Sequence, residues 1–530
     1  MTTDSQVFLK PETKLVPLAG GWYAWIHLIC PAQRALNVAY RHIPLLQSFV
    51  KNSAVHVSAS QDPTLYAGPF VHLRHEQVTE ARHLLEQTLA AGAGLLRFAR
   101  DWRRLDEELQ STAHGYSLSA FYGRLSPSLA GLVELLYDTN NHPRVRLYEE
   151  LLYDEALWAD SYAIRLSLLS ERERPFFMST PLLQSADSIE FSMTLADARV
   201  DLLAAMRTQP ASLADTACAL GVTAAQRPLF DSFFTTVSPA RTAYRYDGNG
   251  VRVRYFGHAC VLVQTARTAV LIDPMFAWET NDKDGRFTFV DLPDHIDYVI
   301  LTHAHQDHCS PEMLIQLRHR IGRVIVPGNN SGSITDPSMK LALRFLGIER
   351  VTVLEAFDAV EFAEGAITSL PFPGEHVDLD IHSRHGIHLD ISGRKFAFLV
   401  DSEGLDPVLF RHIARRVGNL DALFMGMECY GAPLSWLYGP LLTKPLSRRD
   451  DDSRRLSGLD GARAWQVLQA LNSPRVFVYG MGQEPWLRHI MGPEYAPESV
   501  QLTEIRALLE RCRQAGIQAD SLFISHQVEF

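Results

Sequence analysis

The chain has 530 residues and a formal net charge of -11. It is too long for one hydrophobic core, so we expect at least two domains. The acidic balance argues against nucleic-acid binding and provides no basic surface for a membrane. Six scattered cysteines without a C-x-x-C pair, and a first segment without a signal pattern, predict a cytoplasmic protein. The early apolar run at 22–30 is too short to span a bilayer.

Residues 1–240 are predicted to form an α-rich N-terminal domain with some strands near its start. Leucines recur on one face of the stretch 75–109, which is typical of an amphipathic helix. Gly92 lies within this stretch and predicts a junction between two helices. Further helical patterns lie at 129–137, 149–157, 200–206 and 215–220.

The pattern changes near residue 240, and residues 241–530 are predicted to form a second domain of short strands and helices. A D-G-N-G turn within an alternating stretch predicts a hairpin over 245–255. The later predicted strands lie at 261–263, 269–274, 298–301, 323–326, 351–354, 395–400, 422–427, 475–479 and 521–525. An insert at 431–458, predicted to be irregular, interrupts this alternation. A loop of this length within a domain is usually functional or disordered.

The densest group of ligand-type residues follows the predicted strand at 298–301. It comprises His303, His305, Asp307 and His308. Ser310 and Pro311 come next and are typical of a helix start, so these side chains occupy a strand-to-helix turn. Neutral imidazole and carboxylate are ligands for zinc and for iron. The motif therefore predicts a metal site, with the first two histidines on one ion and the other two residues on a second.

This H-x-H-x-D-H motif resembles the signature of the metallo-β-lactamase superfamily. The resemblance covers residues from about 245 to 530. It implies a four-layer αβ/βα sandwich with a dinuclear metal site at the sheet edges. It leaves the reaction open, since the superfamily includes hydrolases, redox enzymes and oxygenases.

The remaining ligands are expected at later strand ends, where Glu375, Asp401 and Glu428 lie. The position of Asp401 matches the bridging aspartate of the superfamily. Hydrolases of the superfamily normally place a histidine where Glu375-His376 stands, and neighbours on an extended segment point in opposite directions. If Glu375 binds, the site is rich in anionic oxygen and suits iron. If His376 binds, a zinc-dependent hydrolase is favoured.

A closer resemblance is to the diiron β-hydroxylase of chloramphenicol biosynthesis and its relatives. It is carried by the histidine motif together with Glu375, Asp401 and Glu428, and by the length and two-part layout of the chain. The resemblance implies two iron ions and O2-dependent β-hydroxylation of an aminoacyl thioester on the carrier domain of a non-ribosomal peptide synthetase. It also implies an external electron donor, a homodimer, and an N-terminal domain that shapes access to the site.

We therefore expect Glu375 and Asp401 to act in catalysis as well as in metal binding. The predicted metal ligands are His303, His305, Asp307, His308, Glu375, Asp401 and Glu428. The alternative is a lactonase or phosphodiesterase that holds two zinc ions and uses a bridging hydroxide as nucleophile.

Overall fold

The computed structural model describes residues 5–154, 162–168, 170–241, 244–280, 284–492 and 494–530. Its C-terminal half contains two seven-stranded sheets. The first has the order β15 (Val351–Leu354), β14 (Ile321–Pro327), β13 (Ile296–Ile300), β12 (Ala269–Ile272), β11 (Val261–Gln264), β10 (Arg252–Tyr255) and β23 (His526–Glu529). The second has the order β16 (Ala359–Phe362), β17 (Gly365–Leu370), β18 (Gly386–Ile391), β19 (Arg394–Leu399), β20 (Ala422–Gly426), β21 (Arg475–Tyr479) and β22 (Gln518–Ser521).

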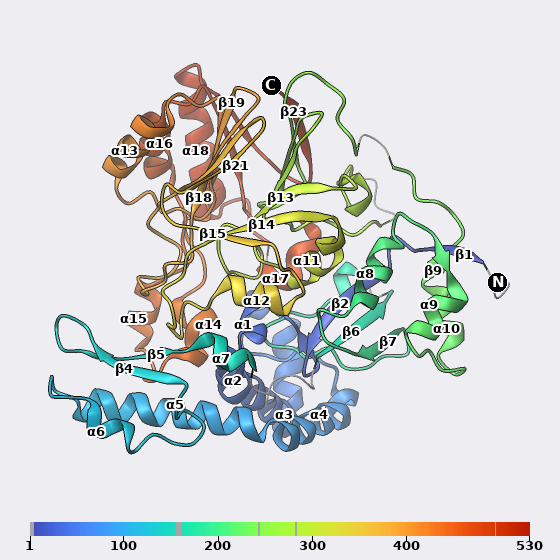
Figure 1. Cartoon of the computed structure of the whole chain (residues 1–530), viewed down its shortest axis with the longest axis vertical. Coiled ribbons are helices and arrows are strands. Elements are labelled where there is room, and N and C mark those ends of the chain that lie inside the picture. The colour runs from blue at the N-terminus through green and yellow to red at the C-terminus, as the bar shows by residue number, and fades with distance from the viewer. Residues whose placement is uncertain (1–4, 155–161, 169, 242–243, 281–283, 493) are drawn as a thin grey trace.

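The inner faces of the two sheets share one buried apolar core. Val263 and Ile300 of the first sheet belong to the same cluster as Phe398 and Phe424 of the second. Helices cover the outer faces, as Figure 1 shows for the second sheet. They are α13 (Pro407–Val417), α16 (Gly461–Leu471) and α18 (Val500–Gln514) on the second sheet, and α11 (Pro311–Leu317) and α12 (Met339–Phe345) on the first. The predicted αβ/βα sandwich is confirmed.

The N-terminal half is rich in helices. They are α1 (Ile26–Ile29), α2 (Pro31–Asn37), a π-helix (Val38–His42), α3 (Ile43–Ser60), α4 (Val78–Ala91), α5 (Ala93–Thr112), α6 (Ser119–Tyr122), α7 (Glu149–Asp154), α8 (Ala198–Ala205), α9 (Leu213–Ala219) and α10 (Arg227–Ser232). The predicted helix junction is confirmed, because α4 ends and α5 begins on either side of Gly92.

Strands run through the whole N-terminal half and not only near its start. They are β1 (Gln6–Leu9), β2 (Lys14–Ala19), β3 (Trp22–Tyr23), β4 (Val133–Tyr137), β5 (Pro143–Leu147), β6 (Tyr162–Ser167), β7 (Ser188–Ser192), β8 (Ala211–Ser212) and β9 (Phe234–Thr235). The helix predicted at 129–137 is therefore wrong, since β4 pairs with β5 in a two-stranded ribbon. Of the helix predicted at 149–157, the part beyond residue 154 lies outside the described residues.

Three predictions in the C-terminal half need correction. No hairpin forms over 245–255, because β10 pairs with β23 from the end of the chain and with β11. The strand predicted at 521–525 is replaced by β22 and β23 on either side of it. The insert at 431–458 is not irregular throughout. It contains α14 (Leu434–Tyr438), a 3-10 turn (Gly439–Leu441) and α15 (Arg448–Ser453).

The two halves of the chain are packed against each other. One apolar cluster includes Leu18 and Leu203 of the N-terminal half together with Leu314 and Leu437 of the C-terminal half. Helix α11 contacts both α8 and β2, so it is covered by the N-terminal half (Figure 1). The division of the chain into residues 1–240 and 241–530 stays a prediction. None of the helices formed by the described residues is long and apolar enough to cross a membrane.

Candidate metal centre

The predicted strand-to-helix turn is present between β13 and α11. The Ser310 hydroxyl accepts a hydrogen bond from the backbone N–H of Met313, and Pro311 is the first helical residue, so the helix start is fixed locally. The four ligand-type residues of the turn are 0 to 7% exposed, and water is therefore largely excluded from them. They are His303, His305, Asp307 and His308.

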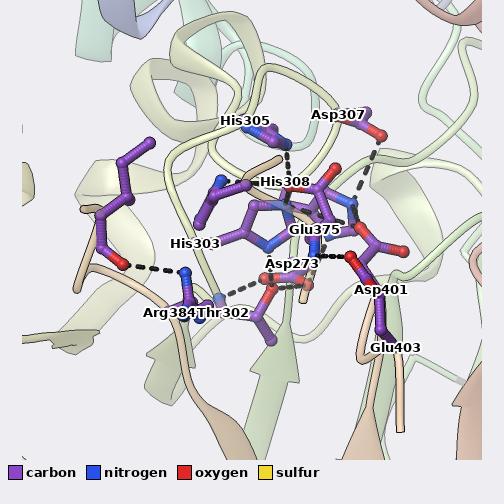
Figure 2. Close-up of polar contacts among 12 residues, drawn as sticks. Asp273, Thr302, His303, His305, Asp307, His308, Glu375, Arg384, Asp401 and Glu403 are labelled. Atoms are coloured by element: carbon purple, nitrogen blue, oxygen red, sulfur yellow. Dashed lines mark hydrogen bonds and ion pairs between the residues drawn. The ribbon is translucent and has the colours of Figure 1, made fainter. Parts of the chain in front are cut away.

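Asp273, directly after β12, orients two of these histidines (Figure 2). Its carboxylate accepts the backbone N–H of Thr302 at 2.8 Å, the Thr302 hydroxyl at 2.6 Å, and Nδ1–H of His308 at 2.8 Å. Thr302 thereby gives its only hydroxyl proton to Asp273, so it accepts from Nδ1–H of His303 at 3.1 Å. Both rings then direct Nε2 at the same point, where a bound metal would take the unprotonated nitrogen.

Two carboxylates from later turns meet these nitrogens. Asp401 follows β19, and its Oδ2 lies 3.0 Å from Nε2 of His308 and 3.5 Å from Nε2 of His303. Glu375 lies in the turn after β17, with Oε2 2.7 Å from Nδ1 of His305. Glu375 and Asp401 have φ angles of 66° and 58°, in the left-handed region that non-glycine residues seldom adopt. Such backbone conformations cluster at functional sites.

The structure brings these residues into three groups of potential ligands, in each of which the ligand atoms lie within 4.8 Å of one another. The groups are His303, His305 and Glu375; His303, His308 and Asp401; and His258, Asp307 and His308. Because His303 and His308 are each shared by two groups, the groups form one continuous cluster. Two metal ions side by side match this arrangement better than one ion does.

Burial shifts the pKa values of the histidines and carboxylates in the cluster. Burial, reinforced by the neighbouring histidines, holds the pKa of His303 well below its usual value. Its Nε2 is buried and has no hydrogen-bond partner among the described residues. Burial also raises the pKa of Glu375 to about 7, against the opposing effect of His305. Buried polar atoms without partners are costly, and a bound cation would satisfy these nitrogens and carboxylates together. The donor set therefore fits a metal.

His258 was missed by the sequence analysis. It follows β10 with a φ of 51°, and its Nε2 lies 3.1 Å from Oδ2 of Asp307 and 3.3 Å from Nε2 of His308. The carboxylate of Glu484 accepts the backbone N–H of His258 at 2.9 Å and holds this turn in place.

Glu375 belongs to one of the three ligand groups found among the described residues, and His376 to none of them. The Nδ1 of His376 lies 3.0 Å from the hydroxyl of Tyr438 and 3.3 Å from Oε2 of Glu375. Figure 2 shows Glu375 among the histidines of the turn. The assignment of Glu375 as a ligand stays a prediction, and this geometry favours it over His376.

Glu428 is placed differently from the other predicted ligands. Its Oε1 accepts a hydrogen bond of 2.5 Å from the hydroxyl of Tyr495, and burial raises its pKa to about 8. Asp401, Asp307 and Glu375 also raise this pKa, so Glu428 lies near the cluster. None of the three ligand groups found among the described residues includes it. Its role as a ligand stays a prediction.

The fold and this donor set define a metallo-β-lactamase-fold protein with a candidate dinuclear metal centre. Comparisons with known proteins narrow the class. Residues 8–238 match the model of the diiron non-haem β-hydroxylase N-terminal domain. Residues 252–407 match the β-lactamase superfamily domain.

The chain is 31% identical over 524 residues to the 4-amino-L-phenylalanyl-[CmlP-peptidyl-carrier-protein] 3-hydroxylase of Streptomyces venezuelae, covering 97% of this chain and 98% of the relative. The crystal structure of CmlA, a diiron β-hydroxylase from Streptomyces venezuelae, superposes with a TM-score of 0.93 at 30% identity. The superposition covers 99% of this chain and 100% of that one. A point mutant of the CmlA β-hydroxylase superposes with a TM-score of 0.91 over the same shares.

The chain belongs to the diiron β-hydroxylase family. The resemblance stated from its sequence is confirmed, and the hydroxylase is supported over the zinc-dependent hydrolase.

Proposed function

We propose that this protein hydroxylates, with O2, the β-carbon of an aminoacyl group held as a thioester on the carrier domain of a non-ribosomal peptide synthetase. The observation that carries this proposal is the identity with a carrier-protein 3-hydroxylase along nearly the full length of both chains. The buried cluster of histidines and carboxylates supports it, because the donors that such chemistry needs are gathered in this chain.

The proposal assigns two iron ions to the cluster. His303, His305 and Glu375 would hold one ion, and Asp307, His308 and His258 or Glu428 the other, with Asp401 between them. Carboxylates are hard, anionic donors and stabilise ferric iron. When bound, the two irons would supply the binding and reduction of O2. The protein supplies the rest, namely ligation, orientation and a buried setting.

The surrounding residues have separate tasks in this proposal. Asp273 and Thr302 keep Nε2 of His303 and His308 unprotonated and aimed at the cluster. Asp401 faces both of those nitrogens, which suits a bridging carboxylate. Glu375 faces His305 most closely and suits a terminal ligand. The left-handed backbone at both acids fixes the direction from which each carboxylate reaches the cluster.

The partners of the reaction also belong to this proposal. They are an aminoacyl-loaded carrier domain, an external electron donor and a second copy of the chain in a homodimer, all in the cytoplasm. Arg448 and Arg449 begin α15 of the insert and are exposed, so they could meet an acidic helix of the carrier.

Two measurements test the proposed function. Protein produced in iron-supplied medium without added zinc should contain two irons per chain. With a reductant, it should transfer one atom from isotopically labelled O2 to the amino acid on a loaded carrier domain. Zinc-containing protein that hydrolyses lactones or phosphodiesters and leaves the carrier-bound amino acid unlabelled would refute the proposal.

A further inference from the structure

The insert at 431–458 reaches the candidate metal centre through one side chain. Tyr438, the last residue of α14, is 1% exposed. Its hydroxyl lies 2.8 Å from Nε2 of His305 and 3.0 Å from Nδ1 of His376. A tyrosine hydroxyl has one proton to donate, so it can donate to at most one of these rings and accepts from at least one of them.

The position of His305 decides which ring is which. Its Nδ1 lies 2.7 Å from Oε2 of Glu375 and therefore faces the ligand cluster. A metal bound to Nδ1 needs an unprotonated nitrogen there, so the proton of the ring sits on Nε2. Nε2–H then donates to the Tyr438 oxygen. Nδ1 of His376 lies within hydrogen-bond distance of the same hydroxyl and 3.3 Å from Oε2 of Glu375. Ligand histidines are commonly held by such a bond from their other ring nitrogen.

Residues of the N-terminal half hold α14 in place. The guanidinium of Arg41 donates to the carbonyl oxygens of Trp436 at 2.7 Å and Leu437 at 3.1 Å. The indole N–H of Trp436 donates to the carbonyl of Ala67 at 3.1 Å. These bonds fix the backbone directly before Tyr438. The chain of contacts therefore runs from the N-terminal half, through the insert, to a ligand of the metal centre.

We propose that Tyr438 is a positioning residue that sets the tautomer and orientation of His305. The assignment rests on the proposed metal centre. It assigns a function to the insert, because α14 places the Tyr438 hydroxyl between the buried rings of His305 and His376. The effect should be local, because His305 belongs to one of the three ligand groups only, the group with His303 and Glu375.

The test is Tyr438→Phe, which removes the hydroxyl and keeps the ring. The matched control is Tyr162→Phe. Tyr162 is also buried, and its hydroxyl donates to the carbonyl of Leu28 at 3.2 Å. Each metal-free protein is titrated with Co(II) in competition with a chelator, and the visible absorption reports the coordination of each bound ion. Thermal unfolding of the metal-free proteins is measured in parallel.

We expect Tyr438→Phe to lower the affinity for one of the two Co(II) ions by about 10- to 100-fold. This is the usual effect of removing the hydrogen-bond partner of a metal ligand. The other ion and the control should bind as in the wild type. Two unchanged binding constants overturn the assignment. So does an equal loss at both ions with a lower unfolding temperature, since that result describes general damage to the fold.

Arg41→Lys provides a second test that leaves Tyr438 in place. Lysine cannot donate to the carbonyls of Trp436 and Leu437 with the geometry of the guanidinium. The affinity for the same Co(II) ion should therefore fall, by a smaller factor. If Tyr438→Phe does not fold, unchanged constants in Arg41→Lys overturn the assignment. A wild-type protein that binds a single Co(II) ion contradicts the dinuclear centre instead. The role of Tyr438 is then supported if the binding constant of that one Co(II) ion falls in Tyr438→Phe, and overturned if it does not.

Discussion

Replacing Asp273 with asparagine should lower the metal affinity of the centre, although no predicted ligand is replaced. The side chain keeps its size, but one of its two acceptor oxygens becomes an N–H donor. The remaining oxygen can still accept the backbone N–H of Thr302, as Oδ1 does at 2.8 Å. The new amide nitrogen would then face the Thr302 hydroxyl and Nδ1 of His308, which now both donate to Oδ2.

The consequence is a change of tautomer. His308 can accept from the new amide only if its proton moves to Nε2, and Nε2 is the nitrogen 3.0 Å from Asp401. Thr302 loses its acceptor as well, so the bond that orients His303 is weakened. Loss of such a partner usually costs about 10- to 100-fold in metal affinity, or about 1.4 to 2.7 kcal/mol. With two histidines affected, we expect the upper end of this range for Asp273→Asn.

The assay is iron content after dialysis at a series of chelator concentrations, with thermal unfolding of the metal-free protein. Glu149→Gln is a suitable control, because this buried carboxylate accepts backbone N–H groups of Ser338 at 2.8 Å and Gly332 at 3.1 Å. It should lower stability and leave iron affinity unchanged. If Asp273→Asn holds both irons as tightly as the wild type, the tautomer argument is wrong.

Three further outcomes are expected. Asp401→Ala should lose about one iron per chain or the whole cluster, and metal counting checks this; two irons with an unchanged spectrum would show that Asp401 is not the bridge and would favour Glu428. Glu375→Asp should keep both irons, because its charge remains, but should change the O2 reaction or its coupling to hydroxylation; single-turnover reaction of the reduced protein with O2 tests it, and an unchanged reaction contradicts it. The carrier-bound thioester should be a good substrate and the free amino acid a poor one; comparable turnover of the two would exclude a role for the carrier.

The parts of the centre that could be predicted from sequence are those set by local rules. The turn after β13 needs only a buried strand, a capped helix start and ligand-type residues between them, and all three are contiguous. Asp401 could be found because it follows a strongly apolar strand and its position matches the bridging aspartate of the superfamily. Asp273 carried the first of these two signals, since it directly follows β12. Because β12 and β13 are parallel neighbours, their ends meet at one edge of the sheet.

The parts that were missed depend on contacts between distant segments. His258 lies in a short turn after β10, and only the pairing of β10 with β11 and β23 places it beside Asp307. The same pairing explains the wrong hairpin, because Arg252 pairs with Glu529 and not with a residue before the D-G-N-G turn. Tyr438 belongs to a segment whose position is set by bonds to the N-terminal half. No local pattern in the sequence contains this information.

The choice between Glu375 and His376 shows how the backbone can decide the chemistry of a site. The two residues were expected to point in opposite directions on an extended segment. The structure reaches the same result with a tight turn. Gly374 has a φ of 133°, and a Cβ there would lie 2.5 Å from the backbone nitrogen of Glu403. Only glycine permits this approach. Glu375 follows in the left-handed region, and its carboxylate lies next to His305. The ring of His376 contacts the hydroxyl of Tyr438. If Glu375 binds, a carboxylate in place of an imidazole makes the centre richer in anionic oxygen, and this difference favours iron and O2 chemistry over zinc-dependent hydrolysis.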